Sequence, residues 1–163
     1  MDDRTIHLIN TISSYLQDIK IETSIIGFDN IEKHPEKLSL GICFSPVTKI
    51  ASNSIRYIIL LYPSFDRTIS VVRETCNTLL SNNSPRKSAL NTALSKDDVY
   101  LFIFSFMHEV GHILHIIQLG YNDSEFFDEQ SGYYYTHNDI CEDFADQFAL
   151  IHTEKIYNIL HNS

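Results

Sequence analysis

The chain has 163 residues, of which 44% are apolar and 20% are charged, so it has the length and composition of one globular domain and not of a disordered or fibrous chain. Twelve basic residues against 21 acidic ones give a net charge of −9. This charge argues against sequence-independent binding to nucleic acid or to anionic lipid, since both require a basic surface.

The N-terminal part of the chain predicts one helix followed by three short strands. Residues 3–20 carry isoleucine and leucine at helical spacing. Residues 21–28, 38–44 and 55–62 are rich in β-branched and aromatic side chains, and Gly, Asn and Pro separate them. We expect a small antiparallel or mixed sheet, and we take 55–62 as a candidate edge strand that could bind an extended substrate by strand addition.

The C-terminal part predicts mainly helices. Three are expected, over residues 65–80, 99–119 and 139–160. Residues 81–96 are expected to form a loop with at most one helical turn, and residues 120–138 a Tyr-rich loop whose length is typical of functional or disordered segments. The expected fold is therefore α+β, in a single domain that spans residues 1–163.

The sequence also predicts the compartment. Three scattered cysteines are too few for a disulfide framework, which favours a reducing, cytoplasmic location. The chain begins with charged residues and not with a basic and then apolar leader. The most apolar segment, residues 99–107, is shorter than the roughly 20 residues that cross a bilayer, so no membrane partner is expected.

One motif carries metal chemistry. His108, Glu109 and His112 form H-E-x-x-H in the middle of the long apolar helix. Residues four apart lie one above the other on a helix face, so both imidazoles can reach one ion, for which Zn²⁺ is the natural candidate. Glu109 is rotated off the ligand stripe, where it can act as general base toward a water molecule at the open coordination position.

A second helix offers a third ligand at Glu142. Asp146 follows four residues later on the same face, where it can accept the outer N–H of a ligating histidine and fix its tautomer. Two neighbours of Glu142 fit less well. Asp143 points about 100° away on the helix, and Cys141 is expected to be a small buried residue and not a thiolate ligand.

Three further side chains compete with Glu142 for the third ligand position. His115 lies on the same face as the two motif histidines, but a full turn farther along the helix, which favours a packing or rim role. His137 and Asp139 lie in or beside the Tyr-rich loop and could coordinate an ion. They lack the partner that Glu142 has in Asp146, so we rank Glu142 first.

A run of tyrosines precedes the final helix. A phenol O–H near the ion could stabilise the oxyanion of a tetrahedral intermediate, a contribution worth several kcal/mol. Tyr133, Tyr134, Tyr135 and His137 are the candidates, and we name Tyr135. The alternative interpretation is that these amphipathic rings simply cover the surface of the loop.

These residues resemble the ImmA/IrrE metallopeptidases. The matching residues are H-E-V-G-H at positions 108–112 and, on the later helix, Glu142, Ala145, Phe148 and Ala149. The strong match covers about 50 residues near the C-terminus, whereas the strands agree only in general layout. Asp146 stands where that family often has Asn, and it is closer to the E-x-x-x-D of thermolysin-like enzymes.

The resemblance implies a zincin-like fold with an active-site helix and a C-terminal ligand helix. It implies zinc ligation by His108, His112 and Glu142, with Glu109 as the catalytic base. It also implies cleavage of an intracellular regulatory protein, often a transcriptional repressor. Two other functions stay open: a non-catalytic protein on the same scaffold that acts as an antagonist of a host or regulatory protein, and a hydrolase of non-peptide amides.

Overall fold

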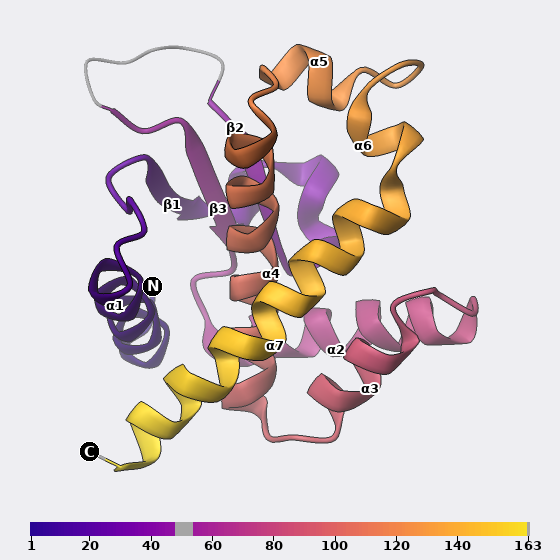
Figure 1. Cartoon of the computed structure of the whole chain (residues 1–163). Coiled ribbons are helices and arrows are strands. Elements are labelled where there is room, and N and C mark those ends of the chain that lie inside the picture. Colours follow the sequence, from indigo (N-terminus) through magenta and orange to yellow (C-terminus); the bar gives the residue numbers. More distant parts are fainter. Residues whose placement is uncertain (48–53, 163) are drawn as a thin grey trace.

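Helix α1 (Asp3–Asp18) begins the chain in the computed structural model, which describes residues 1–47 and 54–162 (Figure 1). Asp2 caps this helix, because its Oδ1 accepts the N–H of Thr5 at 2.9 Å. Its other oxygen, Oδ2, accepts the N–H of Phe65 at 2.7 Å, at the start of helix α2 (Phe65–Ser81). One aspartate therefore fixes the N-termini of two helices that are far apart in the sequence.

The sheet is mixed, with strand order β1-β3-β2. Strand β1 (Ile26–Asn30) pairs in parallel with β3 (Tyr57–Leu61), and β2 (Ile42–Pro46) pairs with β3 in antiparallel fashion. The expectation that residues 55–62 form an edge strand is wrong, because β3 is the central strand and both of its sides are paired. Its nearly continuous apolar sequence reflects burial on both faces.

Two short helical turns connect β1 to β2. They are η1 (Ile31–Lys33) and η2 (Pro35–Leu40), so the start of the strand expected over 38–44 is helical and β2 begins only at Ile42. Gly41 ends η2 with a φ of 79°, and a Cβ added there would lie 2.8 Å from Cγ2 of Val72. The turn therefore packs tightly on α2, which places η2 beside the mouth of the site described below.

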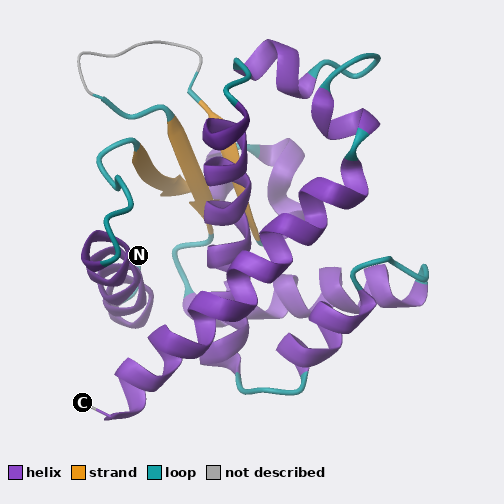
Figure 2. Ribbon diagram, viewed as in Figure 1, coloured by secondary structure: helices purple, strands orange, loops and turns teal. Residues whose placement is uncertain are grey.

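Helices make up most of the remaining chain (Figure 2). They are α2, α3 (Lys87–Leu94), α4 (Asp98–Leu119), α5 (Asp123–Phe127), α6 (Tyr133–Thr136) and α7 (Asn138–Asn162). The expected loop over 81–96 thus contains a helix, whose buried face is made by Ala89, Leu90 and Ala93. The expected loop over 120–138 contains α5 and α6, where Asn122 caps α5 by accepting the N–H of Glu125.

Helices α4 and α7 cross in close contact at the centre of the molecule (Figure 1). A Cβ added to Gly111 of α4 would lie 3.0 Å from Cα of Ala145 on α7, so the absence of a side chain at Gly111 permits this approach. Among the described residues, α4 is the one helix long and apolar enough to cross a membrane, but 78% of the relevant segment is buried inside the fold. Such burial is typical of a core helix.

Candidate metal centre

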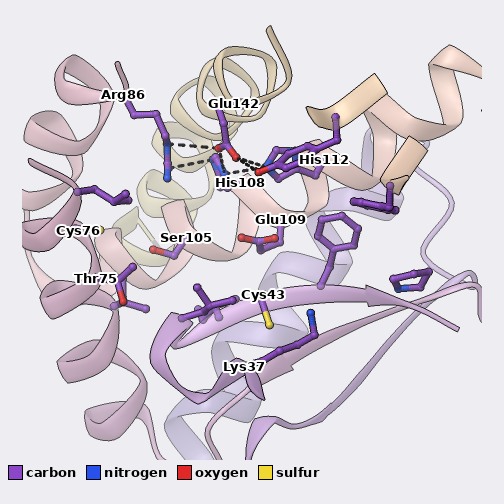
Figure 3. A pocket seen from close by; sticks show the side chains of 18 of the residues that line it. Lys37, Cys43, Thr75, Cys76, Arg86, Ser105, His108, Glu109, His112 and Glu142 are labelled. Atoms are coloured by element: carbon purple, nitrogen blue, oxygen red, sulfur yellow. Dashed lines mark hydrogen bonds and ion pairs between the residues drawn. The ribbon is translucent and has the colours of Figure 1, made fainter. Parts of the chain in front are cut away.

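Three potential ligand atoms converge where α4 meets α7 (Figure 3). The Nε2 atoms of His108 and His112 face each other at 3.1 Å. Glu142 on α7 brings Oε2 to 3.0 Å from Nε2 of His108, and Oε1 to 3.5 Å from Nε2 of His112. The structure therefore brings together the three residues that the sequence predicts as a ligand set.

The dimensions of this triangle fit a tetrahedral metal ion. With metal–ligand bonds of about 2.0–2.1 Å and tetrahedral angles, neighbouring ligand atoms are expected about 3.3 Å apart. The imidazole nitrogens are 3.1 Å apart, and the two oxygens of Glu142 lie 3.0 Å and 3.5 Å from one imidazole nitrogen each, so the donor atoms of the three residues gather at about this spacing. In addition, the buried Oε2 of Glu142 lies 3.0 Å from Nε2 of His108 and 3.6 Å from Nε of Arg86, so its lone pairs face nitrogen atoms among which a cation could be held. The group of His108, His112 and Glu142 could therefore hold a metal ion.

Asp146 lies behind His108, as the sequence predicts. Its Oδ1 is 2.8 Å from Nδ1 of the imidazole, and both groups are buried. A carboxylate at this position favours the tautomer with the proton on Nδ1. The Nε2 lone pair of His108 is then directed toward the centre of the ligand triangle.

Arg86 is part of the centre, and sequence reasoning missed it. It precedes α3, in the segment expected to be a loop, and its guanidinium donates two hydrogen bonds of 2.9 Å to the carboxylate of Asp146. Its Nε also lies 3.6 Å from Oε2 of Glu142. No spacing pattern links residue 86 to 146, so only the packing of α3 against α7 reveals this contact.

Strong electrostatic coupling follows from this arrangement. Burial and the Arg86 guanidinium act to lower the pKa of His108, but hydrogen bonds to Asp146 and Glu142 outweigh them and raise it to about 9. Burial acts to raise the pKa of Glu142, but the hydrogen bonds from the two histidines hold it far below its ordinary value. A cation that binds here must therefore displace a proton from His108.

Glu109 lies beside the ligand group and does not belong to it. Its carboxylate lines the same cavity, between α4 and β2 (Figure 3). Burial raises the pKa of Glu109, and the neighbouring histidines only partly offset this effect. A carboxylate with a raised pKa, next to a cation site and open to a cavity, is suited to accept and return a proton.

The α5–α6 segment covers the other side of the centre. Tyr134 donates its hydroxyl proton to Oε1 of Glu142 at 2.9 Å, and its ring lies 6.0 Å from that of His112. Tyr135, the tyrosine named from the sequence, also lines the cavity but is 51% exposed. Tyr134 is therefore the tyrosine in contact with the ligand group.

The alternative ligands lie elsewhere. His115 is buried, and its ring stacks on Phe144 with a centroid separation of 4.2 Å, which is the packing role expected of it. His137 is exposed and stacks on Tyr133, and Cys141 is fully buried as a free thiol. Asp139 and Asp143 are exposed, apart from the ligand group.

The ligand triangle opens into a cavity of about 810 Å³ that runs between α4, β2 and α2. Ile42, Cys43 and Phe44 all line it, although neighbouring residues of a strand point to opposite faces, so the edge of β2 itself faces the cavity.

No family model matches this sequence, and no curated protein or solved structure does either.

Proposed function

We propose that the protein is a zinc-dependent metallopeptidase with a zincin-like fold. The observation that carries this proposal is the convergence of His108, His112 and Glu142, with separations that suit tetrahedral zinc, next to the carboxylate of Glu109. Two imidazoles and one carboxylate leave a fourth position open, which is the arrangement of a catalytic zinc site and not of a structural one.

Zinc bound by these three residues would supply a Lewis acid that polarises a carbonyl group and lowers the pKa of water. Glu109 then accepts the proton of the attacking water and delivers it to the amide nitrogen that leaves. Asp146 holds His108 in the required tautomer, and Arg86 holds Asp146 in place. The hydroxyl of Tyr134 contacts Oε1 of Glu142, and for this closeness to the ligand group we assign to Tyr134 the oxyanion-stabilising role that sequence reasoning gave to Tyr135.

The edge of β2 supports the binding of an extended peptide. Strand β2 pairs with β3 on one side, and its other side faces the cavity beside Glu109. A peptide that adds to this edge gains main-chain hydrogen bonds along its length. Strand addition, expected from the sequence at residues 55–62, is therefore proposed at β2.

The resemblance to ImmA/IrrE metallopeptidases supports a protein substrate inside the cell. We propose a regulatory protein, such as a transcriptional repressor, as that substrate. A cleft of about 810 Å³ beside a strand edge suits an extended segment of such a protein better than a small non-peptide amide.

The decisive experiment compares the zinc-loaded parent with a Glu109→Gln variant. Both proteins are incubated with purified bacterial repressors and with a peptide library, and mass spectrometry identifies the products. The parent should cleave peptide bonds, and the variant should bind zinc equally but lose about 10²–10⁴-fold in rate. Equal activity of the two proteins, or no cleavage by the loaded parent, would contradict a peptidase.

A further inference from the structure

The cavity beside the metal centre has two chemically different arms. On one side of Glu109 it extends to α2, where Thr75 and Cys76 lie, and on the other side it passes His112 (Figure 3). The arm beyond His112 is lined by the rings of Phe44, Phe127 and Tyr134, together with the carboxylate of Asp123. The arm toward α2, which we call the α2 arm, is lined mainly by aliphatic and thiol groups.

The floor of the α2 arm is buried and apolar. Ile42 and Val72 are 5% and 3% exposed, Cys76 is 7% exposed and Phe104 is 1% exposed. Burial raises the pKa of the Cys76 thiol, so this group stays neutral. Any side chain that enters the arm therefore exchanges water for an uncharged, apolar surface.

Apart from the hydroxyl of Ser105, which lies on the α4 side of the cavity near Glu109, the polar groups at this arm are engaged or lie at its rim (Figure 3). The hydroxyl proton of Thr75 is shared between the carbonyl oxygens of Ser39 at 2.7 Å and Val71 at 3.0 Å, so that its methyl group is the part left for the cavity. Arg86 is held by two hydrogen bonds to Asp146. Lys37 lines the cavity from η2, where it is half-buried, and the exposed Leu40 and half-buried Leu79 complete the rim.

From this lining we propose that the protein selects substrates with an aliphatic side chain, such as Leu, Ile, Val or Met, next to the scissile bond, and that the α2 arm binds it. This inference rests on the proposed peptidase function. A carboxylate side chain could reach Lys37, but it would lose its hydration against the apolar floor. Full burial of an apolar side chain there is expected to favour such a substrate about 10–100-fold over one that leaves the arm empty.

The first test is a profile of cleavage sites. Zinc-loaded protein is incubated with a peptide library made by protease digestion of a cell lysate, and the new termini are sequenced by mass spectrometry. Aliphatic residues should be enriched at one of the two positions that flank the cleaved bond. Enrichment of Asp or Glu there, or no preference, would overturn the inference but leave the peptidase intact. Absence of any cleavage would instead overturn the proposed function itself.

The second test changes the rim of the α2 arm. Leu79→Glu places a charge at the arm, and Leu40→Glu does so at a position that is 43% exposed and therefore tolerant of substitution. Ile151→Glu is the matched control, because Ile151 is 56% exposed on α7 and lies outside the cavity lining.

For a peptide with Leu at the selected position, kcat/KM should fall about tenfold in Leu79→Glu and roughly threefold in Leu40→Glu. It should stay unchanged in Ile151→Glu. For a peptide with Lys at that position, the two rim variants should be as good as the parent or better. An equal loss on both peptides, or no loss on the Leu peptide, would show that the α2 arm does not select the substrate.

Discussion

Arg86 holds Asp146 by two parallel hydrogen bonds of 2.9 Å, from Nε to Oδ2 and from Nη2 to Oδ1. This paired geometry fixes the plane of the carboxylate that contacts Nδ1 of His108. The guanidinium also offsets part of the negative charge of the three carboxylates at the centre. Three carboxylates and one guanidinium leave a formal excess of two negative charges, which one divalent cation neutralises.

Loss of Arg86 should therefore weaken metal binding. We expect Arg86→Gln to lower zinc affinity about 10–100-fold, as removal of a group that orients a ligand typically does. Arg86→Lys should retain more zinc affinity than Arg86→Gln but less than the parent, because an ammonium group keeps the charge and cannot make the two parallel hydrogen bonds. Competition with a chromophoric chelator measures both. Arg73→Gln, which removes a surface ion pair with Asp98, is the control and should keep the zinc affinity of the parent. Parent-like zinc affinity in Arg86→Gln would show that Arg86 does not support the metal ligands.

Tyr134 and Tyr135 form a matched pair for the phenol role. Tyr134→Phe removes the hydroxyl that contacts Glu142, so kcat/KM should fall about 10²-fold, as for loss of one oxyanion donor. Tyr135→Phe should change it less than about twofold, because that side chain is half exposed. Steady-state kinetics on one peptide decides between them. The reverse ranking would return the catalytic role to Tyr135.

Gly111 should tolerate no branched side chain. A Cβ there already lies 3.0 Å from Cα of Ala145, so Gly111→Val must separate α4 from α7. We expect a loss of about 1–3 kcal/mol in the free energy of unfolding, which exceeds the gain of a few tenths from helix propensity. Urea denaturation measures this loss. Gln118→Val, at an exposed position of the same helix, is the control and should have little effect on stability. If Gly111→Val were as stable as the parent, α4 and α7 would not be in close contact.

Glu109 should cost the metal-free protein stability in a pH-dependent way. Burial raises its pKa above the ordinary value of 4.5, so the folded state disfavours the carboxylate. The neutral carboxyl group of Glu109 makes its full contribution to the free energy of unfolding below pH 4.5. This contribution is lost as the pH rises through the raised pKa, because the buried group then ionises. Metal-free Glu109→Gln should therefore be as stable as the parent near pH 4 and more stable at pH 8. Urea denaturation at both pH values checks this, and a less stable variant at pH 8 would contradict it.

Local patterns were sufficient to predict the long elements of the fold. The spacing of apolar residues predicted α1, α2, α4 and α7 close to their observed bounds. The same patterns missed α3, because its buried face consists mostly of small alanines with a weak apolar signal. They also placed 55–62 at an edge, since strand order depends on contacts between distant segments and not on the composition of one strand.

In the candidate site, too, local spacing predicts some residues and only tertiary packing reveals the others. His108 and His112 are predictable because helical spacing alone places them together, and the four-residue interval from Glu142 to Asp146 repeats that logic on α7. Arg86 and Tyr134 reach the centre through tertiary packing, in segments without regular spacing. The choice between Tyr134 and Tyr135 depends on the orientation of a single short helix, which three consecutive tyrosines leave undetermined.

Zinc K-edge X-ray absorption of the protein loaded with one equivalent of zinc reports the atoms that bind the ion. The ligand set of His108, His112 and Glu142 predicts four nitrogen or oxygen neighbours at about 2.0–2.2 Å, with the multiple-scattering pattern of two imidazoles. The spectrum should lose one imidazole in His112→Ala. Sulfur neighbours near 2.3 Å, or a spectrum of hydrated zinc without imidazole, would contradict the account.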